Sequence, residues 1–241
     1  MAAGTIISLH ERNRARQIKD GARAERTEVI PNGVDVGHFL QARTSRSEAQ
    51  SVPLVVGLIG RIVPIKDIKT FVRAIRIIVS RLPAAQGWLI GPEEEDQAYV
   101  EECRNVIQSL GLEQRVSFRG FQRPDHIMPQ LGLVVLTSIS EGFPLVLTEA
   151  FASGVPVVAT DVGACREMIE GRTPEDRALG AAGAVVPIAD PEATAEAAIA
   201  LLTNEVAWRA ARAAGIARVE RYYTRAAVFK RYREIYREAG L

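Results

Sequence analysis

From about residue 52 onward, short runs of β-branched and other apolar residues alternate with longer segments of helical period. This alternation is typical of βαβ units, which build a parallel sheet covered by helices on both faces. The predicted strands are residues 52–60, 86–91, 115–119, 133–137, 155–160 and 184–187. The predicted helices are residues 67–82, 96–110, 124–131, 144–153 and 165–170, before a loop over 171–183 and an Ala-rich helical tail over 191–239. The fold class is therefore α/β, with a Rossmann-like parallel sheet.

The composition fits one globular chain with a sizeable core, because 47% of its 241 residues are hydrophobic and 24% are charged. The formal net charge of +1 gives no basis for a nucleic-acid partner. No apolar run approaches the roughly 20 residues of a membrane-spanning helix, so no transmembrane segment is predicted. The first residues do not resemble a signal peptide, and Cys103 and Cys165 alone do not suggest a disulfide framework. We expect a cytoplasmic location.

The first fifty residues follow a different pattern. Residues 5–9 are predicted as an isolated strand, 10–20 as a charged helix and 41–51 as a polar linker. We therefore divide the chain into a remnant of another domain with its linker (1–50), a Rossmann-like domain (51–220) and a closing helix (221–241). The closing helix lacks a large apolar stripe that the Rossmann-like domain would have to bury.

The strongest candidate site lies where the predicted strand 133–137 meets the helix 144–153, since open α/β sheets bind ligands at this edge. Gly142 lets the backbone approach a ligand, and the free N–H groups of the first helical turn suit a phosphate or a sugar hydroxyl. Glu149 suits the vicinal hydroxyls of a ribose, because a carboxylate accepts two hydrogen bonds at once. The alternative reading of Glu149 is a solvated helix side chain.

A second candidate site follows the first strand of the predicted domain, where Gly60 and Arg61 precede Lys66. The planar guanidinium and the ammonium group together suit a diphosphate, and they can stabilise a departing nucleoside diphosphate. The alternative is an ordinary surface arginine and lysine near a helix start. The three histidines of the chain have no metal-ligand spacing, so no metal site is predicted.

Three segments occur in a recognisable order: Val-Ile-Pro-Asn-Gly-Val-Asp at 29–35, Gly-Arg with the downstream lysine at 60–66, and Glu-Gly-Phe-Pro through the second glutamate at 141–149. Together they resemble the family 4 retaining glycosyltransferases, over about residues 5–171. The stretches 61–71 and 160–167 resemble more narrowly the cytosolic glycosyltransferases of Pel exopolysaccharide synthesis. The resemblance implies the C-terminal, donor-binding half of a GT-B fold.

The resemblance also implies an activity, namely transfer of a sugar from a nucleoside diphosphate with retention of configuration and with no metal or other cofactor. The narrower resemblance favours a UDP-sugar and a role in polysaccharide or glycoconjugate synthesis. The residues that the resemblance assigns to catalysis are Arg61, Lys66 and Glu141. Those that it assigns to donor binding are Gly60, Arg119, Gly120, Phe121, Ser138, Gly142, Phe143, Pro144, Leu145 and Glu149.

A GT-B enzyme has two Rossmann-like domains, whereas this chain has residues for one and a remnant. The expected partners are the nucleotide-sugar donor and an N-terminal acceptor domain, or another chain that supplies it. We expect the helix at 221–241 to cross to that domain, and we expect the chain alone to bind donor with little or no transfer. The alternatives are a non-catalytic nucleotide-sugar-binding module, or another GT-B activity such as epimerisation, phosphorolysis or sugar-phosphate coupling.

Overall fold

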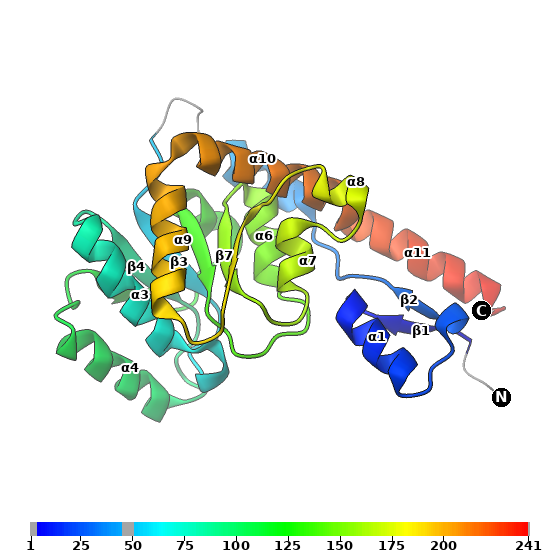
Figure 1. Ribbon diagram of the computed structural model, residues 1–241, viewed down its shortest axis with the longest axis horizontal. Coiled ribbons are helices and arrows are strands. Elements are labelled where there is room, and N and C mark those ends of the chain that lie inside the picture. Colours follow the sequence, from blue (N-terminus) through cyan, green and yellow to red (C-terminus); the bar gives the residue numbers. More distant parts are fainter. Residues whose placement is uncertain (1–3, 45–50, 241) are drawn as a thin grey trace.

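The computed structural model describes residues 4–44 and 51–240. Its centre is a six-stranded sheet, seen nearly edge-on in Figure 1. The strands are β3 (Val55–Ile59), β4 (Gln86–Ile90), β5 (Val116–Phe118), β6 (Leu133–Leu136), β7 (Val157–Thr160) and β8 (Gly183–Val186). All neighbours pair in parallel, in the order β5-β4-β3-β6-β7-β8. This order winds outward from β3 in both directions, which confirms the Rossmann-like prediction.

Helices cover both faces of the sheet. They are α3 (Ile68–Arg81), α4 (Gln97–Ser109), α6 (Leu145–Ser153), α7 (Cys165–Glu170), α9 (Pro191–Thr203) and α10 (Glu205–Tyr222). On one face, α3, α4 and α9 bury apolar side chains such as Phe71 and Val100. On the other face, α6, α7 and α10 bury Phe151, Met168 and Val219. Because both faces are covered, β6 and β7 are apolar at nearly every position and fully buried.

The structure corrects three details of the predicted elements. The segment 171–183 contains a short helix, α8 (Pro174–Arg177), because Thr173 caps it and Pro174 occupies its first turn. The tail over 191–239 is three helices, since Asn204 begins α10 and Thr224 begins α11 (Arg225–Glu238). The predicted helix over 124–131 is α5 (Pro124–Ile127) followed by a 3₁₀ turn, Met128–Gln130.

The N-terminal residues form a second, smaller unit beside α11 (Figure 1). Strand β1 (Ile6–Ser8) is not isolated, because it pairs in parallel with β2 (Thr27–Val29), which the sequence pattern missed. Helix α1 (Glu11–Lys19) and a 3₁₀ turn, Ala24–Arg26, connect them. Val228 and Ile235 of α11 pack against Ile30 and form a small core of their own. The predicted domain boundaries remain a prediction.

The chain passes between the two units at two adjacent points. The Val34 N–H donates to the Tyr223 carbonyl at 2.8 Å, and the Arg225 N–H donates to the Val34 carbonyl at 2.9 Å. A Cβ on Gly33 would lie 2.7 Å from the Arg225 Cα, so this crossing needs a glycine. The 3₁₀ turn Val36–Phe39 and α2 (Leu40–Thr44) then pack against α6. The predicted linker over 41–51 therefore begins inside a helix, and its residues 45–50 lie outside the described ones.

No helix in the described part of the chain combines the length and the apolar character that crossing a bilayer requires.

A fully buried ion pair ties α10 to the segment after α7. Arg218 has 0% of its side chain exposed, and its Nε donates to Asp176 Oδ1 at 2.6 Å. Its other guanidinium nitrogens donate to the carbonyl groups of Ile169, Asp176 and Gly180. One side chain thus satisfies three carbonyl groups of a segment that is rich in glycine and has little regular structure.

Because Arg218→Ala leaves the Asp176 carboxylate buried without its cation, we expect it to lower the free energy of unfolding by about 3–5 kcal/mol. Urea denaturation measures this loss. The double variant Arg218→Met with Asp176→Leu removes both charges and should recover a large part of the loss. Arg81→Gln breaks an exposed pair with Glu196 and should cost about 0–1 kcal/mol. A loss in Arg218→Ala no larger than in Arg81→Gln would contradict the role of the buried pair.

Candidate functional site

The two candidate segments meet where the winding direction of the sheet reverses, between β3 and β6. The residues after β3 and those after β6 lie at the same edge, because the strands are parallel neighbours. The Thr137 hydroxyl donates to the carbonyl groups of Lys66 and Asp67, both at 2.9 Å. The Ile139 N–H donates to the Ile65 carbonyl at 3.0 Å. These bonds join the two loops into one rigid rim.

Lys66 and Glu141 are in direct contact on this rim. Lys66 Nζ lies 2.5 Å from Glu141 Oε1, and the Ser138 hydroxyl donates to the same oxygen at 2.7 Å. The two charged side chains are 16% and 13% exposed, so a ligand at the edge can still reach them. Gly60 adopts a φ of +154°, which favours glycine, and it lies against Lys66, since a Cβ there would be in ordinary contact with Lys66 Cε at 3.4 Å.

The N-terminus of α6 faces the same edge. Pro144 is its N-cap residue, and no side chain caps the first turn. Gly142 borders open space, since a Cβ there would meet no atom within 4 Å. Helix α6 therefore directs free N–H groups toward a surface that an anion or a hydroxyl can occupy.

The loop after β7 supports this surface from behind. A Cβ on Gly163 would lie 2.2 Å from the Glu141 carbonyl oxygen, and the Ala164 N–H donates to the Gly142 carbonyl at 3.0 Å. Phe143 is buried with its ring edge-on to Tyr223, 5.6 Å between centroids, and Pro144 is buried beside it. The predicted motif thus contains two kinds of residue. Some, such as Phe143, have buried side chains that shape the loop, and others, such as Leu145, remain open to a ligand.

Glu149 faces a separate cavity of about 310 Å³. Its lining comes from α6, from α5, from the turn after Gly33 and from the start of α11: Gly33, Val34, Asp35, His38, Phe39, Pro124, Leu145, Thr148, Glu149 and Arg225. Among the described residues the Glu149 carboxylate has no hydrogen bond or ion pair. Burial raises its pKa, and the nearby His38 acts in the opposite direction.

Sequence reasoning assigned no role to His38, Asp35 or Arg225, although they line the cavity of Glu149. The only signal was that the segment 29–35 belongs to the recognised motif set. These residues come from the two chain crossings described above, which periodicity within 51–220 does not reveal. The interaction of His38 with Asp125, 3.4 Å between Nε2 and Oδ2, is likewise a tertiary contact.

Arg61 lies apart from the contact between Lys66 and Glu141. It is about half exposed, and its Nη1 donates to the two carboxylate oxygens of Glu95 at 2.6 and 2.8 Å.

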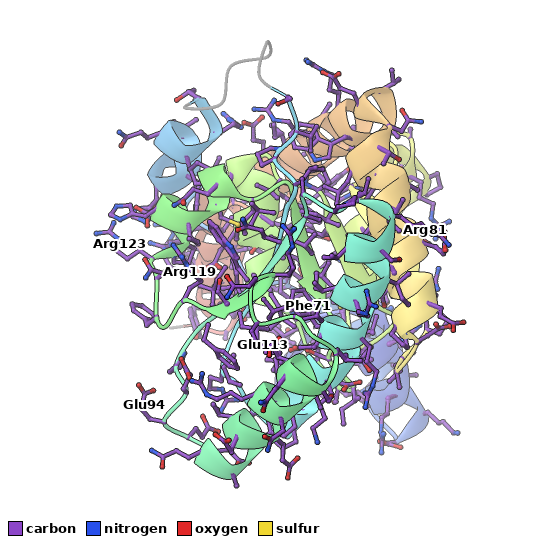
Figure 2. All side chains as sticks on the ribbon, turned by 90° about the vertical axis from the view of Figure 1, so that its left-hand side faces the viewer. Phe71, Arg81, Glu94, Glu113, Arg119 and Arg123 are labelled. Carbon is purple, nitrogen blue, oxygen red and sulfur yellow. The ribbon has the colours of Figure 1, made fainter. Side chains whose placement is uncertain are left out.

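The loop after β5 carries the residues predicted to bind the base. The Arg119 guanidinium lies 4.5 Å from the centroid of the Trp88 ring, and Phe121 is 74% exposed. Arg119 and Arg123 lie on the same side of the molecule (Figure 2).

Gly120 turns this loop with a φ of +60°, and its carbonyl accepts a hydrogen bond from the Gly91 N–H at 2.9 Å. The loop after β5 is thereby attached to the end of β4.

Burial raises the pKa of Cys165 to about 12, which fits a packing role for this thiol. Within residues 4–44 and 51–240, no group of three His, Cys, Asp or Glu side chains is arranged to hold a metal ion.

The strand order, with charged side chains at the edge where its winding reverses, defines a Rossmann-like α/β domain. The chain belongs to the family described as glycosyl transferases group 1, which matches residues 53–204. This confirms the family-level resemblance, whereas the narrower resemblance to the Pel enzymes remains a prediction.

Curated relatives agree with this family. The D-inositol 3-phosphate glycosyltransferase of Nocardia farcinica is 35% identical over 162 residues, which are 62% of this chain and 36% of that protein. The lipopolysaccharide core biosynthesis mannosyltransferase LpsB of Rhizobium meliloti is 31% identical over 210 residues, which are 81% of this chain and 56% of that protein. The chain thus spans about a third to just over half of these relatives.

Solved structures share the fold. The crystal structure of Anabaena HepE in complex with UDP and glucose matches 98% of this chain and 64% of that one, with a TM-score of 0.82 and 24% identity. The sucrose-phosphate synthase of Thermosynechococcus elongatus matches 99% of this chain and 59% of that one, with a TM-score of 0.79 and 25% identity.

The raised pKa of Glu149 predicts a pH-dependent stability. Because the folded state holds this proton more tightly than the unfolded state, the ionised carboxylate destabilises the fold above the folded pKa. The penalty disappears as the pH falls below the ordinary pKa of a glutamate. We therefore expect Glu149→Gln to be more stable than the unchanged chain at neutral pH, with the two converging in acid.

Urea denaturation at a series of pH values measures this difference. Glu101→Gln, which alters an exposed carboxyl on α4, is the control and should follow the unchanged chain at every pH. A Glu149→Gln variant whose stability parallels the unchanged chain across the whole series contradicts the buried, unpaired state of this carboxylate.

Proposed function

We propose that this chain is the donor-binding part of a retaining glycosyltransferase that takes a sugar from UDP without a metal ion. The observation that carries the proposal is the contact of Lys66 with Glu141 at the reversal of the sheet, in front of the uncapped N-terminus of α6. A cation, free N–H groups and a carboxylate there match the diphosphate and the hydroxyl groups of a nucleotide sugar.

Lys66 binds the diphosphate in this proposal. Its ammonium has three donors, so it can contact a phosphate oxygen while it remains beside Glu141. The N–H groups of Gly142, Phe143 and Leu145 and the dipole of α6 add positive potential at the same place. Arg61 reaches the diphosphate by leaving Glu95, because an exposed ion pair contributes little and is easily exchanged.

The remaining parts of the donor have their own contacts. Glu149 accepts hydrogen bonds from the two ribose hydroxyls, which suits a carboxylate that has no partner of its own. The exposed ring of Phe121 and the backbone of Arg119 and Gly120 hold the base. Glu141 faces the hydroxyls of the donor sugar, fixed by Ser138 and Lys66.

In the proposed reaction the bond between the anomeric carbon and the diphosphate breaks, and the acceptor oxygen attacks from the same face. The leaving phosphate takes the proton of the acceptor hydroxyl, so no protein base is needed. Lys66, Arg61 and the N-terminus of α6 stabilise the negative charge that develops on the diphosphate. The protein contributes position and electrostatics.

The comparisons support the choice of donor. HepE has been crystallised with UDP, with UDP and glucose and with UDP-glucose. LpsB is named for lipopolysaccharide core synthesis, which agrees with a role in polysaccharide or glycoconjugate synthesis. We further propose that an acceptor domain, from additional sequence or from a partner chain, completes the enzyme in the cytoplasm.

A thermal-shift titration of the purified chain with UDP, GDP, ADP and inorganic phosphate tests the proposal. UDP at 100 times its dissociation constant should add about 2.7 kcal/mol to the free energy of unfolding. A domain of this size gains about 2–4 °C in Tm per kcal/mol. Lys66→Ala and Glu149→Ala should each reduce the UDP shift strongly, because they remove a diphosphate contact and a ribose contact.

Lys69→Ala is the matched control, because it removes a lysine of α3 that pairs with Glu102 of α4 and with no residue of the proposed site. It should leave the UDP shift unchanged. If no nucleoside diphosphate stabilises the chain, or if Lys66→Ala and Lys69→Ala behave alike, the proposed donor site is wrong. A larger shift with GDP or ADP would keep the site and change the base.

A further inference from the structure

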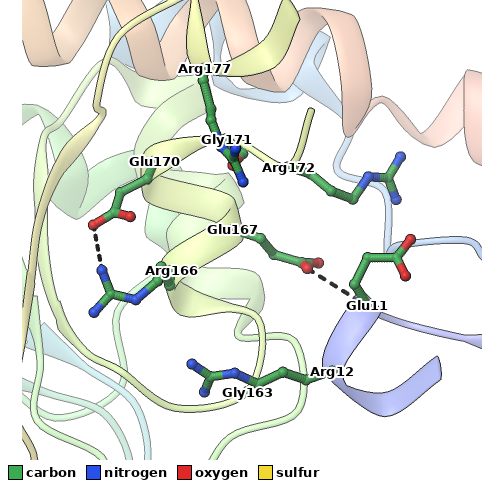
Figure 3. A pocket seen from close by; sticks show the side chains of 9 residues that line it. All are labelled: Glu11, Arg12, Gly163, Arg166, Glu167, Glu170, Gly171, Arg172 and Arg177. Carbon is green, nitrogen blue, oxygen red and sulfur yellow. Dashed lines mark hydrogen bonds and ion pairs between the residues drawn. The ribbon is translucent and has the colours of Figure 1, made fainter. Parts of the chain in front are cut away.

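A second cavity, of about 420 Å³, lies between α1 and α7 (Figure 3). Its walls come from the N-terminal unit, from α7 and from the segment 171–177. Four arginines line it, namely Arg12, Arg166, Arg172 and Arg177. Its volume falls within the range of small-molecule sites, and the donor contacts proposed above use none of these four residues.

Two of the four arginines already have carboxylate partners. Arg12 pairs with Asp161 at 2.8 Å, and Arg166 pairs with Asp161 at 2.9 Å and with Glu170 at 2.8 Å. The guanidinium groups of Arg172 and Arg177 have no ion pair with any described residue. Arg177 Nε donates only to the Gly171 carbonyl at 3.2 Å. Two cations at the wall of the cavity are therefore available to an anion.

These two arginines stand on a segment that the fold holds rigidly. The Arg172 N–H donates to Asp176 Oδ2 at 2.9 Å, and the other oxygen of that carboxylate accepts from the buried Arg218. The Arg177 N–H donates to the Thr173 carbonyl at 2.9 Å. The buried ion pair thus fixes the backbone at Arg172, and the bond to Thr173 fixes it at Arg177, which reduces the ordering cost of binding a ligand there.

The cavity also contains a carboxylate suited to hydroxyl groups. Glu167 Oε2 accepts the Glu11 N–H at 3.2 Å, and Figure 3 shows this side chain directed toward α1, on the side of Arg172. Burial raises the pKa of Glu167, whereas Arg172 acts in the opposite direction. A carboxylate beside arginines matches a ligand that has both hydroxyl groups and an anionic group.

The cavity adjoins the proposed donor site. Gly163 lines it, and the same glycine packs against the carbonyl groups of Glu141 and Gly142. The loop that faces the donor sugar therefore has the donor on one side and this cavity near the other. A molecule that spans the loop can bring a hydroxyl toward the reacting sugar.

We propose that the cavity binds a sugar or polyol that carries a phosphate or carboxylate group, with the anionic group at Arg172 and Arg177 and hydroxyls at Glu167. Its use as the acceptor subsite rests on the proposed glycosyltransferase function. Binding of the anionic sugar does not depend on that function, so the two can be tested separately.

The test is a titration of the ¹⁵N-labelled chain, followed by NMR, in the presence of saturating UDP to fill the donor site. The probes are glucose 6-phosphate, glucuronate, glucose and inorganic phosphate. We expect at least one anionic sugar to shift the amide signals of Gly163, Glu167 and Arg172, with weaker effects of glucose and of inorganic phosphate. The stronger of the two anionic probes identifies the anionic group.

Arg172→Gln should weaken binding of that probe about tenfold, since it removes a charge-assisted contact while its backbone bond to Asp176 remains. Arg81→Gln makes the same charge change in an exposed pair with Glu196, neither of which lines the cavity, and should not alter binding. The inference is overturned if no anionic sugar shifts these signals, if Arg172→Gln binds as tightly as the unchanged chain, or if inorganic phosphate alone binds equally well.

The UDP titration tests the proposed donor function independently of the anionic-sugar site. If UDP leaves the spectrum unchanged while an anionic sugar binds and Arg172→Gln weakens it, the donor function fails and the anionic-sugar site stands. If UDP binds and the anionic sugars do not, the donor function stands and the second site fails.

Discussion

The parallel pairing of β3 with β6 is the constraint on which the candidate site depends. These strands are far apart in the sequence, yet their pairing places Lys66 and Glu141, 75 residues apart, in contact at one edge. The face of β3 is also closely packed at Gly57, because a Cβ there would lie 2.6 Å from Leu131 Cδ1. The bonds from Thr137 then fix the two loops, so the charged side chains need little reorganisation when a ligand binds.

Two ion pairs, Arg218 with Asp176 and Lys66 with Glu141, differ in what water and ligands can reach. Arg218 and Asp176 are 0% and 3% exposed, and their hydrogen bonds hold the backbone from Ile169 to Gly180. Lys66 and Glu141 keep part of their surface exposed, so a phosphate or a hydroxyl can join them. Removing one partner of the first pair is costly to the fold, whereas in the proposed function the second pair stays together and adds a contact to the substrate.

Two cavities flank the loop between β6 and α6, and each contains a carboxylate whose pKa is raised by burial. Glu149 faces one and Glu167 the other, with Gly163 packed against the loop between them. Carboxylates without strong cationic partners suit hydroxyl groups, which sugars supply in abundance. In the second cavity, Arg172 adds a preference for a phosphate or carboxylate group.

The sequence by itself determined the α/β class and the order of strands and helices over 52–170, because buried parallel strands and amphipathic helices leave strong local patterns. It also determined the segments that contain Lys66, Glu141 and Glu149. It missed β2, which has three residues and is stabilised by its pairing with β1, and α8, which depends on a cap and a buried arginine. Only the tertiary structure decided that Lys66 contacts Glu141 while Arg61 pairs with Glu95, and that His38 lines the cavity of Glu149. These contacts join residues from distant segments, and their geometry follows from sheet pairing and chain crossings that local periodicity does not encode.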